Sequence, residues 1–192
     1  MPANGTLRVL GIDPGSRKTG WGVVEKHGNV YRCLGHGIAS APAKLDLPHR
    51  IYQIVQQVEQ MIEQHAPDCM AVEEAFYHES VRSTLVLGHV RGALLVAGVA
   101  RSLEIAEYSP REVKLSVAGS GSAAKEQVEF MVRRMLDIKG PLQADASDAL
   151  GVAVCHLNRA RRPVGASTLG ASTLGAATRG LEALLARKVR KS

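Results

Sequence analysis

The beginning of the sequence limits the fold more than any other part, because an apolar segment there ends abruptly on an acid. Residues 7–12 are apolar except for one Arg and one Gly, and Asp13-Pro14-Gly15 follows. Proline fixes φ near a turn value and glycine accepts a φ that other residues resist, so the chain should reverse here. Residues 19–25 again have strand character. Asp13 is therefore expected to end a buried strand at the mouth of a hairpin, although a turn aspartate that caps its own loop fits the pattern as well.

Hydrophobic periodicity and turn signals extend this start into an α/β order. Strands that follow one another through tight turns are expected to pair antiparallel, and strands separated by helices are expected to cross over and join in parallel. The fold class is thus α/β, with a mixed sheet flanked by helices. The expected strands are residues 7–13, 19–25, 30–39, 69–72 and 105–108, and the expected helices run over 47–65, 80–103, from 109, 123–136 and 145–161.

Composition indicates one folded domain in a reducing compartment. The 192 residues are 45% apolar and 22% charged, which suffices for a substantial core. The longest apolar stretch, residues 85–99, is interrupted by a His and an Arg, and no signal-peptide pattern opens the chain, so we expect a cytoplasmic protein without a membrane span. The cysteines have no metal-ligand spacing and are expected to be free thiols: Cys33, Cys69 and Cys155.

The C-terminal segment differs in kind from the rest. Gly-Ala-Ser-Thr-Leu occurs at 165–169 and again at 170–174, and repeats of such small residues cannot bury a core. Residues 163–192 carry five basic side chains against one Glu, a net +4 of the chain's +6, which leaves +2 on residues 1–162. We expect a folded domain over 1–162 and a flexible linker with a basic end over 163–192. That end could be an arm for nucleic acid or a dispensable tail.

Acidic residues stand at the ends of two expected strands and at the start of one expected helix. Asp145 and Asp148 lie at positions i and i+3, on one face of the first turns of a helix, where acids also occur simply because the helix dipole favours them. Asp13 and Glu73 each end an expected buried strand, and such strand ends converge at one rim of an α/β sheet. Four carboxylates gathered there repel one another unless a cation joins them. Oxygen ligands favour Mg²⁺ or Mn²⁺ over zinc, and two such ions support phosphodiester hydrolysis.

Four separated motifs together resemble the RuvC family of Holliday junction resolvases. They are, in order, residues 11–16 (Gly-Ile-Asp-Pro-Gly-Ser) with Thr19-Gly20, residues 72–76 (Val-Glu-Glu-Ala-Phe), residues 119–125 (Gly-Ser-Gly-Ser-Ala-Ala-Lys) and residues 143–150 (Gln-Ala-Asp-Ala-Ser-Asp-Ala-Leu). The similarity covers residues 7–160, and the repeats of the tail do not belong to it.

This resemblance implies an RNase H-like fold and a homodimer with one Mg²⁺-dependent site, expected to hold two ions, in each subunit. Each site would nick one of two like-polarity strands of four-way junction DNA, together with the branch-migration proteins RuvA and RuvB. The residues that match the family's catalytic acids, and so its metal ligands, are Asp13, Glu73, Asp145 and Asp148, while Glu74 falls outside the site. We assign Asp13 as the ligand that bridges the two metals.

Three further residues match family positions for DNA binding. Phe76 matches an aromatic side chain thought to stack on an unpaired base at the junction, and Lys114 and Lys125 match basic residues near the site. Lys125 follows a Gly-Ser joint at a helix start, which suits a phosphate. The alternatives are a core aromatic side chain and ordinary surface lysines. Weaker candidates without a motif are Arg82, Arg111 and Arg133.

The helix expected over 80–103 is apolar nearly all round and contains several small residues, so it could be buried against the sheet or form a two-fold helix interface. With the implied homodimer, we favour the interface. Two other functions stay open. One is a related nuclease of the same fold that cuts other branched or RNA-containing substrates. The other is a non-catalytic junction-binding protein, which the presence of all four acids disfavours.

Overall fold

The first three strands form an antiparallel meander, as the turn signals predict. β1 (Thr6–Asp13), β2 (Lys18–His27) and β3 (Val30–Ser40) pair in sequence order. The computed structural model describes residues 6–74 and 80–160. The other elements are α1 (Leu47–His65), β4 (Cys69–Glu73), α2 (Val81–Ala100), β5 (Glu104–Tyr108), α3 (Pro110–Ala118), α4 (Lys125–Met135) and α5 (Ala144–Arg159).

The sheet is mixed, which confirms the predicted α/β fold class. Its five strands lie in the order β3-β2-β1-β4-β5, and β4 pairs in parallel with both β1 and β5. The parallel register sets Ile12 beside Val72, so the next residues of both strands, Asp13 and Glu73, end at the same rim. The central strand β1 thus delivers its last residue to the middle of that rim.

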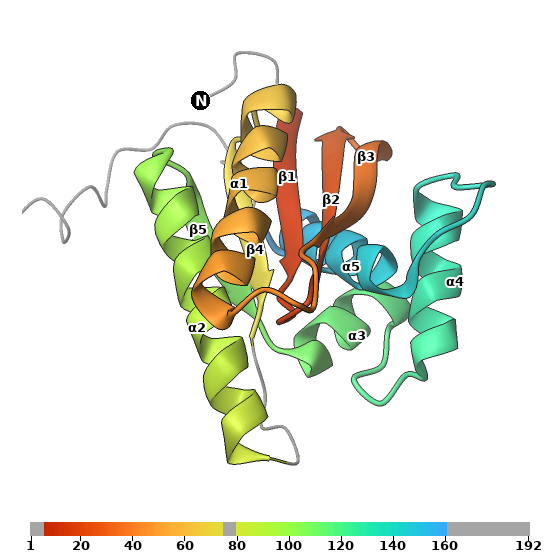
Figure 1. The fold of residues 1–192 in the computed structure, drawn as a ribbon. Coiled ribbons are helices and arrows are strands. Elements are labelled where there is room, and N and C mark those ends of the chain that lie inside the picture. Colours follow the sequence, from red (N-terminus) through yellow and green to blue (C-terminus); the bar gives the residue numbers. More distant parts are fainter. Residues whose placement is uncertain (1–5, 75–79, 161–192) are drawn as a thin grey trace, which may run out of the picture. The chain divides into compact units, whose positions relative to one another are not determined.

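Helices cover both faces of the sheet (Figure 1). On one face, α5 packs across β1 and β2 together with α3 and α4, and on the other α1 and α2 lie side by side. Successive residues of β1 therefore enter different cores: Val9 packs with the α5 layer, whereas Leu10 packs with the α1 and α2 layer. A strand buried on both faces needs a continuous apolar run, which accounts for the sequence before Asp13.

The helix ends follow local chemistry. The side chain of Asp46 accepts a hydrogen bond from the His49 backbone N–H and caps α1, as the Asp-Leu-Pro pattern predicts. α2 ends at Ala100, earlier than the predicted residue 103. The reason is that Ser102 adopts a φ of 59° and the backbone N–H of Leu103 turns back to the carbonyl of Gly98. The predicted linker and basic end, residues 163–192, lie outside the described residues.

Helix α2 is long and apolar enough to cross a membrane by length and composition alone. In this structure 28% of its apolar window is buried. Its buried side chains include Val90 and Leu94, which pack in the sheet core. Several large apolar side chains remain on its outer side: Val81, Leu85, Val96 and Val99. The helix therefore packs on the sheet with one side and presents a second apolar side outward.

Candidate active site

The turn after β1 is held by the buried side chain of Thr19. Its hydroxyl donates to the Gly15 carbonyl at 3.1 Å and accepts from the Gly15 backbone N–H at 3.2 Å. Thr19 is fully buried, so this contact is protected from water. The turn that follows Asp13 is consequently fixed from the start of β2.

Glycines in β1 and β2 bring α5 into backbone contact with the sheet. A Cβ on Gly11 would lie 2.0 Å from the carbonyl oxygen of Ala149, and one on Gly20 would lie 1.9 Å from that of Asp145. Only glycine permits such an approach. Gly20 also pairs with Asp13 across the hairpin, so the first turn of α5 sits directly over the end of β1. Neither glycine was predicted to have this role, although glycine inside a strand signals a close backbone approach.

The four predicted acids share one electrostatic environment. Asp13 and Glu73 end neighbouring parallel strands, and Asp145 and Asp148 lie in the first turns of α5. Burial, followed by the negative charges of Glu73, Asp148 and Asp145 in that order, raises the pKa of Asp13 to about 8. Burial, followed by the charge of Asp148, likewise raises the pKa of Glu73 to about 7. The two strand ends and the helix therefore converge on one strongly acidic site.

Two lysines lie beside these acids. Lys125 is the first residue of α4, and its Nζ lies 2.6 Å from Oδ2 of Asp148. This hydrogen bond raises the pKa of Lys125, and the Lys125 charge in turn lowers that of Asp13. The charges of Lys125 and, to a smaller extent, of Lys114 on α3 also lower the pKa of Glu73. Both lysines that the sequence suggested for DNA binding are thus close enough to the acids to act on them.

The donor set fits hard divalent cations. Among residues 6–74 and 80–160, no three His, Cys, Asp or Glu side chains are drawn together tightly enough to chelate one ion. The pKa values of Asp13 and Glu73 are raised first by burial and then by repulsion from neighbouring acids, and a bound divalent cation would offset both effects. Since the acids supply only carboxylate oxygens, the site suits Mg²⁺ or Mn²⁺ better than zinc.

Among the described residues, Glu74, Arg111 and Arg133 make contacts other than with these acids. Phe76 lies outside the described residues, so stacking on a base stays a prediction. Glu74 is exposed, and its backbone N–H donates to the Tyr108 carbonyl at 2.9 Å. Arg133 is engaged within its own region, donating to Glu129 and to the Gly140 carbonyl, which favours a structural role. Arg111 packs its side chain against the Gly121 backbone.

A mixed sheet of this strand order, with acids from β1, β4 and α5 at one rim, defines the RNase H-like class of proteins. The family model for crossover junction endodeoxyribonuclease RuvC matches residues 9–156. The chain belongs to the RuvC family, and both the suspected resemblance and the expected fold are confirmed.

Sequence similarity to known RuvC proteins extends along most of the chain. The RuvC crossover junction endodeoxyribonuclease of Geobacter sulfurreducens is 46% identical over 154 residues, which cover 80% of this chain and 94% of that protein. The corresponding protein of Janthinobacterium is 46% identical over 150 residues, covering 78% and 83%. Thermus thermophilus RuvC, solved in complex with a Holliday junction substrate, superposes with a TM-score of 0.76 at 34% identity, over 81% of this chain and 95% of that one.

Proposed function

We propose that this protein is a structure-specific endonuclease that resolves four-way DNA junctions in recombination and repair by paired symmetric nicks. The observation that carries the proposal is the convergence of Asp13, Glu73, Asp145 and Asp148 at one rim, where burial and mutual repulsion raise the pKa of Asp13 to about 8. Membership of the RuvC family supports the same reading. The Thermus relative was solved with a Holliday junction, which favours that substrate.

The position of each residue in the site indicates its role. The four acids would hold two divalent cations, with Asp13 between them because it lies at the centre of the rim. When bound, these ions activate the attacking water and stabilise the leaving oxygen. Lys125 supplies a positive charge next to Asp148, and the backbone contact between Gly20 and Asp145 keeps the helix acids over the strand acids. We propose Mg²⁺ as the metal, with Mn²⁺ as the alternative.

The apolar side of α2 supports a homodimer. A groove of about 770 Å³ lies between α1 and α2 and has a mostly apolar lining. At its edges Tyr52 of α1 is 61% exposed and Val96 of α2 is 68% exposed. Large apolar side chains in such numbers are normally covered by another protein surface. We propose a second copy of this chain in a two-fold arrangement, which would also provide the two active sites that paired nicks require.

The family relationship also leads us to propose a cytoplasmic enzyme that cooperates with RuvA and RuvB. Two other functions remain to be separated from this one by experiment. A related nuclease would prefer an RNA–DNA hybrid or another branched DNA. A non-catalytic junction-binding protein would bind without cutting.

One assay compares these functions directly. The protein is incubated with a synthetic four-way junction, a linear duplex of the same sequence and an RNA–DNA hybrid, each with Mg²⁺ and with EDTA. We expect Mg²⁺-dependent, symmetrically paired nicks in the junction alone. Cleavage of the hybrid in preference to the junction would favour the related nuclease, and binding without cleavage would favour the non-catalytic protein.

A further inference from the structure

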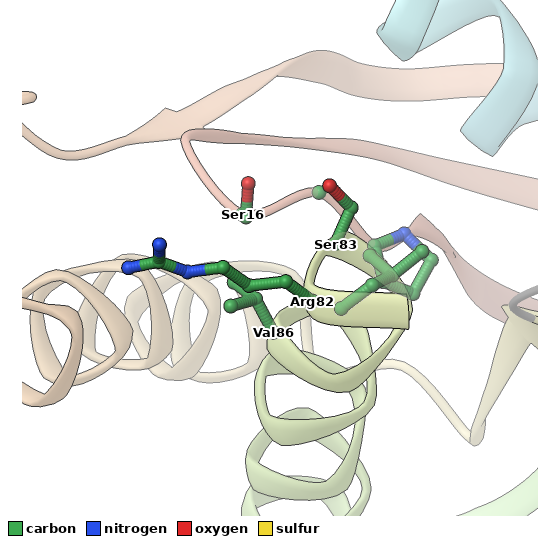
Figure 2. A pocket seen from close by; sticks show the side chains of 7 residues that line it. Ser16, Arg82, Ser83 and Val86 are labelled. Atoms are coloured by element: carbon green, nitrogen blue, oxygen red, sulfur yellow. The ribbon is translucent and has the colours of Figure 1, made fainter. Parts of the chain in front are cut away.

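A pocket of about 460 Å³ adjoins the turn that follows Asp13 (Figure 2). One wall is the turn itself, and the other is the first part of α2, which lies more than sixty residues away in the sequence. The lining residues are Pro14, Gly15, Ser16, Arg82, Ser83, Val86 and Leu87. Since Pro14 is bonded to Asp13, any group in this pocket would lie next to the acid cluster.

The lining combines one cation, two hydroxyl groups and an apolar floor. Figure 2 shows the extended side chain of Arg82 running past Ser16 and Val86, with the hydroxyls of Ser16 and Ser83 on the same side. In the described part of the chain, no hydrogen-bond or ion-pair partner is found for the Arg82 side chain. Arg82 is exposed, so its guanidinium can reach an anion in solution.

Among the described residues, the charged side chains in the pocket lining and in the turn beside it are basic. The lining contains no acidic side chain, and the first turn of α2 contains none either. Arg17 and Lys18 follow Ser16 in the same turn, and both are exposed. This flank therefore attracts anions, whereas the neighbouring acids attract metal ions. A DNA strand that places one phosphate at the metals needs such a cationic surface for the adjoining phosphates.

We propose that this pocket binds the DNA backbone beside the cut. A phosphodiester would lie on the Arg82 guanidinium and the Ser16 hydroxyl, and its deoxyribose would lie on Val86 and Leu87. The inference rests on the proposed function, because it takes the acid cluster as the point of cleavage. It assigns Arg82 and Ser16, neither of which the metal site uses, to holding the cleaved strand in register.

The first test measures binding to a four-way junction in EDTA, where no cleavage occurs, over a series of KCl concentrations. Arg82→Ala should weaken binding about three- to tenfold, as expected for one charged contact at an exposed site. The slope of log K against log salt should fall by about 0.9, the value for one phosphate. Arg32→Ala is the matched control, because Arg32 is also an exposed arginine. It lies opposite Glu25 in the sheet register, at the other end of β2 from Gly20 and the pocket.

The second test locates the phosphate. Single neutral methylphosphonates are placed around the cut site, and binding is measured for the wild-type protein and for Arg82→Ala. One substitution within about two nucleotides of the cut should weaken wild-type binding as much as Arg82→Ala does, and should have no further effect on that variant. Additive losses at every position, or a variant that binds like the wild type with an unchanged salt slope, would overturn the proposal.

Nicking of the same junction by the wild-type protein in Mg²⁺ separates the two proposals. If the protein nicks the junction and Arg82→Ala binds normally, the pocket proposal fails and the proposed function stands. If the protein binds through Arg82 without nicking in any metal, the proposed function fails, and of the pocket proposal only the contact between Arg82 and the DNA backbone stands.

Discussion

Nζ of Lys125 lies 2.6 Å from Oδ2 of Asp148, so an ammonium group directly contacts one of the four acids. The two residues are 23 positions apart and belong to different helices, α4 and α5. The pair partly offsets the repulsion among the acids. It also holds a cation where the phosphate of a DNA strand would approach.

Replacing Lys125 with alanine should weaken junction binding and lower its salt dependence by about one unit of slope, because one phosphate contact is lost. Anisotropy of a labelled junction in EDTA at several KCl concentrations measures both quantities. The control is Lys139→Ala. Lys139 also pairs with a carboxylate, that of Asp137 at 3.5 Å, but both side chains of that pair are largely exposed. Equal slopes for the two variants would exclude a phosphate contact by Lys125.

The stability of the metal-free protein should fall as the pH rises. Asp13 keeps its proton up to about pH 8 in the folded state, whereas its ordinary pKa is 3.8. Between these values the folded chain holds a proton that the unfolded chain has released, so the unfolding free energy decreases with increasing pH. Thermal unfolding in EDTA from pH 4 to pH 8 tests this, with Asp13→Asn as the comparison.

The decrease of the unfolding free energy with rising pH should be smaller in Asp13→Asn, since the amide does not titrate. Adding Mg²⁺ at pH 8 should raise the melting temperature of the wild type more than that of the variant. Identical pH profiles for the two proteins would show that Asp13 is not held in the acidic environment described above.

Gly20→Ala should destabilise the protein by about 1–3 kcal/mol or more, as overpacking does. The added Cβ would lie 1.9 Å from the Asp145 carbonyl oxygen, so α5 would have to move away from the hairpin. Urea unfolding measures the change, and nicking activity should drop with it because Asp145 moves with the helix. At Gly140 an added Cβ would meet no atom within 4 Å, so Gly140→Ala should change neither property. A tolerated Gly20→Ala would mean that the close contact does not position the acids.

Val96→Glu should convert the proposed dimer to a monomer. The substitution places a charge on a side chain that is 68% exposed in the isolated subunit and lines the groove between α1 and α2. Sedimentation at micromolar concentration measures the oligomeric state. Phe130 of α4 is 61% exposed and does not line that groove, so Phe130→Glu should remain dimeric. A wild-type protein that sediments as a monomer would contradict the interface.

The strand ends could be predicted from sequence because they depend on local signals. A continuous apolar run marks β1, and Pro14-Gly15 marks where it stops, so Asp13 could be placed at a rim before the fold was known. The fold itself followed from the alternation of strands and helices together with the four motifs. The early end of α2 was missed, since it depends on the positive φ of Ser102.

Other parts of the site depend on contacts between distant segments. Nothing near Gly20 in the sequence indicates that the Asp145 backbone lies against it. Arg82 carries no motif, and only the packing of α2 beside the β1–β2 turn makes it part of a pocket. Lys125 does belong to a motif, but its contact with Asp148 forms only because α4 and α5 come together.

We propose that Asp13 is the hub of a metal-dependent cleavage site. Binding and nicking of a four-way junction in Mg²⁺ are measured for Asp13→Asn and, as a control, for Glu74→Gln, which alters an exposed acid outside the site. We predict that Asp13→Asn binds the junction but does not nick it, whereas Glu74→Gln does both. Nicking by Asp13→Asn at the wild-type rate would contradict the claim.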